Sequence, residues 1–91
     1  MEAVRRRLKM YRALDNEHRL RIVLTLASRP GLSFNELAGE LGLERGLLAY
    51  HLAVLKNAGL VELKYERRSK KLTKYYLTKD GVKVLKELGL L

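Results

Sequence analysis

Residues 33–61 of this 91-residue chain read SFNELAGELGLERGLLAYHLAVLKNAGLV and carry the clearest signals of its fold. Ser33 and Glu36 have the spacing of a capping box, in which each side chain satisfies a backbone N–H group at a helix start. Gly42 ends the first apolar helical repeat, because glycine adopts the positive φ of a helix C-terminus without steric cost. A second helix is predicted at 44–58. Two short helices joined by a tight glycine turn indicate a helix-turn-helix motif at about 33–58.

A β-hairpin is predicted directly after the second helix. Apolar and charged residues alternate at 61–66, which is typical of a strand with one buried face. A polar turn is predicted at 68–71 and a returning strand at 73–77. The segment 60–77 therefore has the position and composition of the wing in a winged helix.

Further helices are predicted on both sides of these elements. An apolar repeat predicts a helix at 2–14, and Asn16 can cap another helix that ends before Pro30, the only proline. A last helix is predicted at 78–89. The predicted fold is mainly α with a small β-hairpin wing, a winged helix-turn-helix in the order α-α-α-α-β-β-α, and residues 1–91 form a single domain.

Composition excludes several classes of protein. The chain has no cysteine, so disulfide frameworks, thiolate metal sites and cysteine nucleophiles are excluded. The longest run without a charged residue is the ten residues 46–55, whereas a membrane span needs about 20. The N-terminal residues lack the apolar segment of a secretory signal. We therefore expect a soluble, intracellular, cytoplasmic protein with no membrane partner.

The charge is strongly positive and unevenly distributed. The formal net charge is +9 and the isoelectric point is near 10.1. Residues 1–31 hold eight Lys and Arg against three acids, and residues 60–91 hold nine against four, whereas residues 32–59 hold two against three. A net charge this far from zero favours a polyanionic partner, with a role in solubility alone as the alternative. Clustering in the two outer thirds favours nucleic acid.

Four segments resemble the winged helix-turn-helix regulators of the arsenic-repressor (ArsR-like) family, with some similarity to the MarR-like type. They are LDNEHRLRI at 14–22, FNELA through LGL at 34–43, HLAVLKNAGLV at 51–61 and YLTKDG at 76–81. The resemblance covers about residues 11–88. It implies a DNA-binding transcriptional regulator, and because such regulators are commonly dimers it also implies a palindromic operator.

The sequence departs from this family at the metal site. Metal-sensing members carry a cysteine pair on the first helix of the motif, which here reads FNELAGEL. Sensing of soft metals at that site is therefore excluded. We expect no metal at His18 and His51, a packing role for His51 near the core side of its helix, and no cofactor.

The helix at 44–58 is the predicted recognition helix, which lies in the major groove of double-stranded DNA. At 100° per residue, its core side is centred on Leu48 and its outer side carries mostly small residues, which allow close approach to the base pairs. Tyr50 is predicted to contact a base or sugar. The alanines are predicted to contact a thymine methyl group, with helix propensity on a solvated face as the alternative. The predicted DNA-binding residues of this helix are Arg45, Gly46, Ala49, Tyr50, Ala53, Lys56 and Asn57.

The wing supplies the second set of predicted DNA contacts. Its cations, within 64–74, are Lys64, Arg67, Arg68, Lys70, Lys71 and Lys74. Because the recognition helix is nearly neutral, the wing and the first third of the chain are expected to neutralise phosphates along the backbone or in the minor groove. With few side chains to read bases, part of the sequence preference is expected from DNA shape.

The terminal helices, 2–14 and 78–89, are the predicted homodimer surface. Each has an apolar stripe beyond what a small core absorbs, and exposed apolar patches usually mark partner surfaces. The predicted interface residues are Val4, Leu8, Tyr11, Val82, Leu85, Leu88 and Leu91. The alternative is that both stripes close the core of the monomer.

The predicted function is a sequence-specific regulator of transcription that binds double-stranded DNA as a homodimeric repressor. An enzyme is disfavoured, because no glycine-rich phosphate loop or catalytic arrangement of histidine, serine and acid is present. Two alternatives stay open: a winged helix that binds protein or RNA, and an architectural DNA binder of low specificity. The absence of glutamine among abundant Lys, Arg and Glu fits a heat-adapted source. The sequence does not identify an effector ligand.

Overall fold

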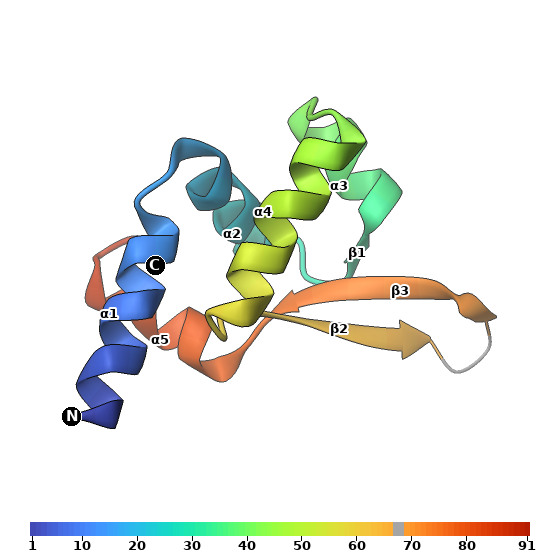
Figure 1. Cartoon of the computed structure of the whole chain (residues 1–91). Coiled ribbons are helices and arrows are strands. Elements are labelled where there is room, and N and C mark those ends of the chain that lie inside the picture. The colour runs from blue at the N-terminus through green and yellow to red at the C-terminus, as the bar shows by residue number, and fades with distance from the viewer. Residues whose placement is uncertain (67–68) are drawn as a thin grey trace.

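The computed structural model describes residues 1–66 and 69–91, and the side chains of residues 1–65 and 73–91. The helices gather on one side of the molecule, and the hairpin β2–β3 projects away from them (Figure 1). This arrangement confirms the predicted mainly helical winged helix with a hairpin wing. No helix of the described part has the length and apolar run that a membrane crossing requires. The elements are α1 (Glu2–Leu14), α2 (Glu17–Ser28), β1 (Leu32–Ser33), α3 (Phe34–Leu41), α4 (Arg45–Asn57), β2 (Val61–Glu66), β3 (Ser69–Leu77) and α5 (Lys79–Glu87).

The predicted N-terminal caps at Ser33 and Asn16 form the expected hydrogen bonds. Ser33 Oγ accepts from the backbone N–H of Glu36 at 3.1 Å, and Glu36 Oε1 accepts from that of Ser33 at 2.9 Å. Asn16 Oδ1 caps α2 by accepting from the N–H of Arg19 at 3.1 Å. Gly42 has a φ of 64°, a left-handed conformation that glycine tolerates. This turn reverses the chain so that α3 and α4 can pack together.

The sheet has the strand order β1-β3-β2, and both pairs are antiparallel. Strand β1 was not predicted, because two residues paired across Leu32 and Tyr75 leave no periodic signal. The predicted polar turn at 68–71 is corrected in part: β3 begins at Ser69, which pairs with Glu66. A projecting hairpin is stabilised by backbone hydrogen bonds, which form whether the side chains are polar or apolar. Its polar residues therefore resemble a loop when only the sequence is considered.

The core lies between the helices and the start of β2. Leu48 and Leu55 of α4, Ile22 of α2 and Leu37 of α3 are fully buried. The predicted inner side of the recognition helix is therefore confirmed. Leu85 corrects a prediction: it is 1% exposed and belongs to this core, not to an exposed dimer surface. The inward side of α5 is set by the docking of Thr78 and Gly81 against the backbone at Leu60, rather than by its apolar repeat.

Thr78 fixes α5 to the turn that follows α4. Its N–H donates to the carbonyl of Leu60 at 3.0 Å, and its hydroxyl donates to the carbonyl of Gly59 at 2.6 Å. The same hydroxyl accepts from the N–H of Gly81 at 2.8 Å, so it also caps the helix. A Cβ atom at Gly81 would lie 2.4 Å from the Leu60 carbonyl oxygen. Only glycine allows α5 to approach this backbone so closely.

The substitution Gly81→Ala is expected to destabilise the fold by about 1–3 kcal/mol, because the added methyl group meets backbone that cannot move aside. The matched control is Gly39→Ala in the exposed part of α3, where a Cβ would meet nothing within 4 Å. That change should stabilise the fold by roughly 0.5–1 kcal/mol through helix propensity. Urea unfolding followed by circular dichroism measures both. Equal stabilisation by the two alanines would contradict the close packing of α5.

Candidate nucleic-acid interface

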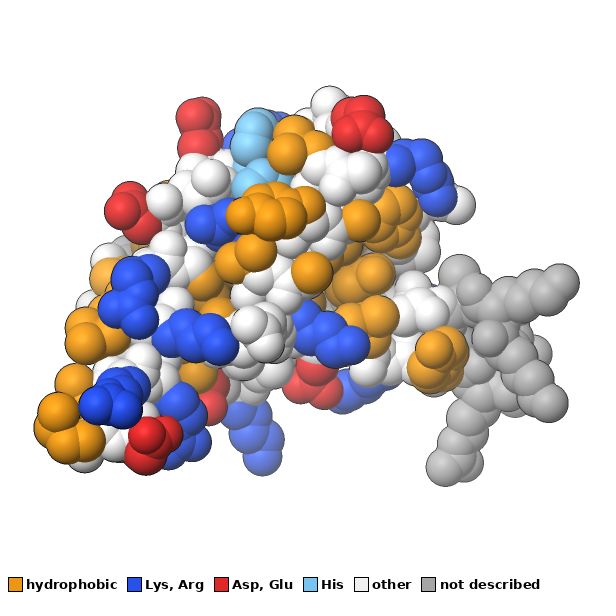
Figure 2. Space-filling view, in the orientation of Figure 1, with side chains coloured by type: hydrophobic (Ala, Val, Ile, Leu, Met, Phe, Trp, Pro, Cys, Tyr) orange, Lys and Arg blue, Asp and Glu red, His pale blue; other side chains and the backbone are white. Residues whose placement is uncertain are grey.

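The outer side of α4 presents a surface without charge. Gly46, Ala49 and Ala53 are exposed, and Tyr50 projects from the same side with 60% of its surface exposed. Figure 2 shows this side of the molecule, with uncharged side chains along α4 and Lys and Arg side chains around it. The structure thus brings together the small residues that the sequence assigned to one helix face. Arg45, Lys56 and Asn57 are exposed on the same helix.

The N-terminus of α4 is capped by an acid of its own chain. The two carboxylate oxygens of Glu44 accept from the N–H groups of Gly46 at 2.8 Å and Leu47 at 3.1 Å. These hydrogen bonds lower the pKa of Glu44 from its ordinary value, so the cap is ionised at neutral pH. A negative charge at this end satisfies the helix dipole and leaves no free N–H pair for a phosphate.

Arg45 is held in position by the first turn of α3. Its guanidinium lies 5.0 Å from the centre of the Phe34 ring and donates a hydrogen bond to Asn35 Oδ1. A guanidinium has five N–H donors, so donors remain for a base edge or a phosphate. Sequence analysis did not find the roles of Phe34 and Asn35. The turn at Gly42 brings the two helix starts together, and no local pattern reports that contact.

Arg19 and His51 join three helices behind the outer face. Arg19 Nε donates to the Ala13 carbonyl at 2.5 Å, and Arg19 Nη1 lies 3.0 Å from His51 Nδ1. Because a guanidinium only donates, His51 Nδ1 accepts and the ring is neutral with its proton on Nε2. Burial lowers the pKa of His51, and the nearby Arg19 and His18 lower it further. The ring also contacts Tyr50 edge-on, with centroids 5.1 Å apart, so the link reaches the exposed face.

The two histidines lie side by side in the structure. The sequence did not predict this contact, because they belong to different helices. The His18 and His51 ring centroids are 5.3 Å apart, and His18 Nδ1 is buried without a hydrogen-bond partner among the described residues. In the part of the chain that the structure describes, no third His, Asp or Glu joins them in a group that could hold a metal ion. The pair packs between α2 and α4.

The described part of the wing carries paired lysines. Lys64 lies directly opposite Lys74 in the β2–β3 register. Lys64 is exposed, 3.7 Å from Glu62 and 5.0 Å from the centre of the Tyr76 ring. Like charges in opposed positions repel each other, and Glu62 beside Lys64 and Glu36 near Lys74 offset part of this repulsion. The predicted wing residues Arg67 and Arg68 lie outside the described residues, as do the side chains of Lys70 and Lys71.

A groove of about 210 Å³ separates α4 from the wing. Most of its lining is apolar, with one cation. The lining residues are Phe34, Ala49, Leu52, Ala53, Lys56, Leu63 and Tyr75. This surface suits methyl groups and sugars better than a phosphate, because it offers many apolar contacts and a single positive charge.

Comparison with known proteins agrees with this geometry. Residues 16–62, just over half of the chain, match the model of the bacterial regulatory proteins of the arsR family. The chain belongs to this family. The fold and the family of this ArsR-family protein are those of DNA-binding transcriptional regulators, which are not enzymes. No curated protein sequence matches the chain.

Solved structures of regulators superpose over most of this ArsR-family chain. Reduced HlyU from Vibrio cholerae N16961 is 32% identical to this chain, with a TM-score of 0.78. The match covers 96% of this chain and 87% of the HlyU chain. The transcriptional regulator HlyU from Vibrio vulnificus CMCP6 is 29% identical over 97% of this chain and 88% of its own, with a TM-score of 0.76. The regulator PcaV from Streptomyces coelicolor shares the fold at 23% identity, over 82% of this chain and 53% of its own, with a TM-score of 0.74.

The buried His51 predicts a pH dependence of stability. Its pKa is below 6.5 in the folded chain and near 6.5 in the unfolded chain, so the unfolded state binds more protons as the pH falls below that value. Stability should be full above about pH 6.5 and should fall through the window down to the lowered pKa, by at most about 1.4 kcal/mol per pH unit. Urea unfolding at several pH values measures this slope.

The substitution His51→Gln removes the titrating group and keeps an acceptor for Arg19, so it should flatten this slope. The control is His18→Gln, which retains the buried imidazole of His51; because burial is the largest cause of the lowered pKa, most of the slope should persist. A wild-type slope that survives in His51→Gln would assign the titration to another group.

Proposed function

We propose that this ArsR-family protein is a homodimeric transcriptional repressor that binds a palindromic operator in double-stranded DNA. Helix α4 enters the major groove, and the wing follows the backbone or the adjacent minor groove. The observation that carries the proposal is the outer face of α4. It is exposed, free of charge and made of small residues around Tyr50, and cations lie beside it.

Base reading and phosphate binding fall to different parts of this interface. Ala49 and Ala53 allow the α4 backbone to approach the base pairs and can contact thymine methyl groups. Tyr50 supplies a hydrogen-bonding hydroxyl at the centre of the face, and Arg45, held by Phe34, can reach a guanine edge. The wing lysines neutralise phosphates, which gives affinity that is independent of sequence and sensitive to salt.

The terminal helices support the dimer part of the proposal. Tyr11 Oη donates to Glu87 Oε1 at 2.9 Å, which holds α1 and α5 side by side. Apolar side chains of α1 and of the segment that follows α5 remain 40–54% exposed, although buried surface is scarce in a chain of this size. They are Val4, Leu8, Leu88, Leu90 and Leu91. Of the other residues assigned to the interface, Tyr11 and Val82 are half-buried.

The substitution Tyr50→Ala is expected to lower the preference for operator over random duplex by about tenfold, or roughly 1.4 kcal/mol, because one base-reading side chain is lost. The operator is first obtained by selection from random duplexes with the purified protein, and fluorescence anisotropy then measures both affinities. The matched variant Lys64→Gln should weaken both duplexes alike and flatten the salt dependence. Equal loss on both duplexes in Tyr50→Ala would remove the base-reading role of Tyr50.

The same titration tests the function as a whole. Single-stranded RNA and an acidic polymer are measured beside the duplex at several salt concentrations. Binding to the selected duplex well above random duplex supports a sequence-specific regulator. Preference for RNA, or equal affinity for all polyanions, would contradict it in favour of an RNA-binding module or a general anion binder.

The wild-type protein is expected to sediment as a dimer, twice 10.5 kDa, at tens of micromolar. The substitution Leu8→Glu should shift it to monomer, because it places a charge in the apolar surface of α1. The matched control is Leu24→Glu on α2, where Leu24 is 37% exposed and lies outside the terminal helices. Sedimentation velocity measures both. A wild-type protein that sediments as a monomer at this concentration would contradict the proposed dimer.

A further inference from the structure

Each of the described helices has an acid at its N-terminus, which disfavours phosphate binding there. The first turns of α1, α2, α3 and α5 contain Glu2, Glu17, Glu36 and Asp80, and Glu44 caps α4. Each acid places a negative charge where a helix dipole would otherwise attract an anion. Phosphate binding by the described residues therefore depends on Lys and Arg side chains and on where they gather.

Three cationic side chains line one pocket at the C-terminal end of α4. The pocket has a volume of about 280 Å³ and lies between α1, α2 and α4. Lys9 and Arg12 line it from α1, Arg19 from α2 and Asn57 from α4, and the remaining described residues of the lining are apolar. None of the lining residues that the structure describes is an acid.

The cationic side chains of this pocket differ in conformational freedom. Arg19 is half-buried and is fixed by its hydrogen bonds to Ala13 and His51, so its charge has one position. The side chains of Lys9 and Arg12 are exposed and form no ion pair with any described residue. A fixed charge with two adjustable charges beside it, and an amide donor from Asn57, offers several N–H donors to one anionic group.

The position of the pocket indicates which anion it takes. Asn57 is at the end of the α4 outer face and also lines the pocket, so the pocket adjoins the surface proposed to face DNA. The groove on the other side of α4, toward the wing, contains Lys56 as its one cation. The two sides of α4 thus differ: the wing groove is mostly apolar, and the pocket beside α1 is cationic.

We propose that the pocket formed by Lys9, Arg12, Arg19 and Asn57 binds one phosphodiester group of the DNA strand that borders the major groove. The inference rests on the proposed function. It adds α1 as a second element, besides the wing, that contacts the DNA backbone, on the side of α4 away from the wing. It also assigns Asn57 to the phosphate rather than to a base. Helix α1 then has two tasks, with its apolar stripe for a partner chain and its basic residues for DNA.

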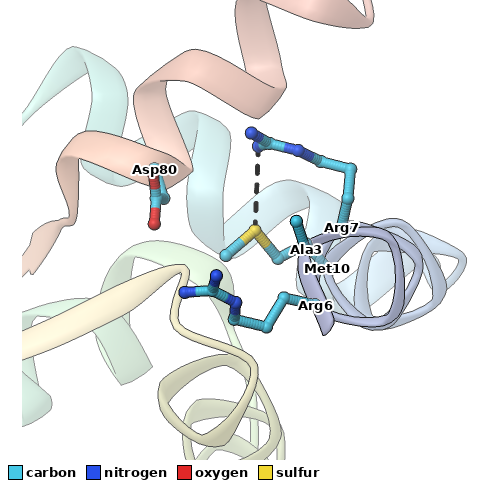
Figure 3. Close-up of a pocket in the computed structure, with 5 residues that line it drawn as sticks. All are labelled: Ala3, Arg6, Arg7, Met10 and Asp80. Atoms are coloured by element: carbon cyan, nitrogen blue, oxygen red, sulfur yellow. Dashed lines mark hydrogen bonds between the residues drawn. The ribbon is translucent and has the colours of Figure 1, made fainter. Parts of the chain in front are cut away.

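The test compares Arg12→Gln with Arg6→Gln in the full chain. Arg6 is on the same helix, but it lines a separate pocket of about 130 Å³ with Asp80 of α5, and it extends on the opposite side of Met10 from Arg7 (Figure 3). Both variants remove one charge. Fluorescence anisotropy with operator and random duplexes, from about 50 to 200 mM salt, gives affinities and salt slopes.

Arg12→Gln should weaken both duplexes alike and reduce the slope of log K against log salt by about 1, whereas Arg6→Gln should leave the slope unchanged. Arg12→Lys should restore most of the slope, because it restores the charge. Asn57→Ala should weaken operator and random duplex equally. A wild-type slope in Arg12→Gln, with operator binding intact, would overturn the pocket and leave the proposed function standing.

Two further outcomes also overturn the inference. A loss in Asn57→Ala confined to the operator would return Asn57 to base reading. Inorganic phosphate is titrated separately against wild-type protein and Arg12→Gln and followed by nuclear magnetic resonance. Phosphate binding that Arg12→Gln abolishes without any change in the DNA salt slope would identify a site for a free anion. Failure of the wild-type chain to bind duplex at all would remove both the inference and the function on which it rests.

Discussion

Burial of one side of α4 determines which residues form the surface that we propose faces DNA. Leu48 and Leu55 are fully buried in a core shared with α2 and α3, and a helix with one side fixed presents the opposite side in a fixed direction. Tyr50 and the small residues therefore point to solvent as a consequence of packing. His51 extends the constraint, because its buried ring accepts from Arg19 and touches Tyr50. A shift of α4 in the core would misplace all of these groups together.

The charge of this protein lies around the outer face of α4, with Arg45 and Lys56 at its edges and further cations on α1 and the wing. An uncharged face can approach base pairs closely, while cations on α1 and the wing can provide affinity without sequence preference. The acids at the helix starts enforce this division, because they satisfy the helix dipoles internally and leave anion binding to side chains. The same acids stabilise helices that are too short to be stable alone.

The first helix of the motif has no cysteine in this arsR-family chain. The first helix of the motif, α3, reads FNELAGEL, so it offers no thiolate ligands. Its first turn instead holds Arg45 through Phe34 and Asn35. The α3 surface of this chain is thus connected to the recognition helix through an aromatic ring and an amide.

The helix-turn-helix, the caps at Asn16 and Ser33, the turn at Gly42 and the two sides of α4 could all be predicted from the sequence. These features follow from rules that act within a few residues, namely cap chemistry, positive φ at glycine and the 3.6-residue period. The same local rules placed a strand over 61–66 but could not find β1, whose two residues are ordered only by pairing with β3.

The contacts between distant segments could be established from the tertiary structure alone. It buried Leu85, which the apolar repeat of α5 had placed with exposed residues, because Thr78 and Gly81 dock that helix against the backbone at Leu60. It also joined Arg19 to His51 and brought the basic side chains of α1 beside Asn57. Such contacts depend on how whole helices pack, and packing is set by the combined shape of the core, which no single stretch of sequence carries.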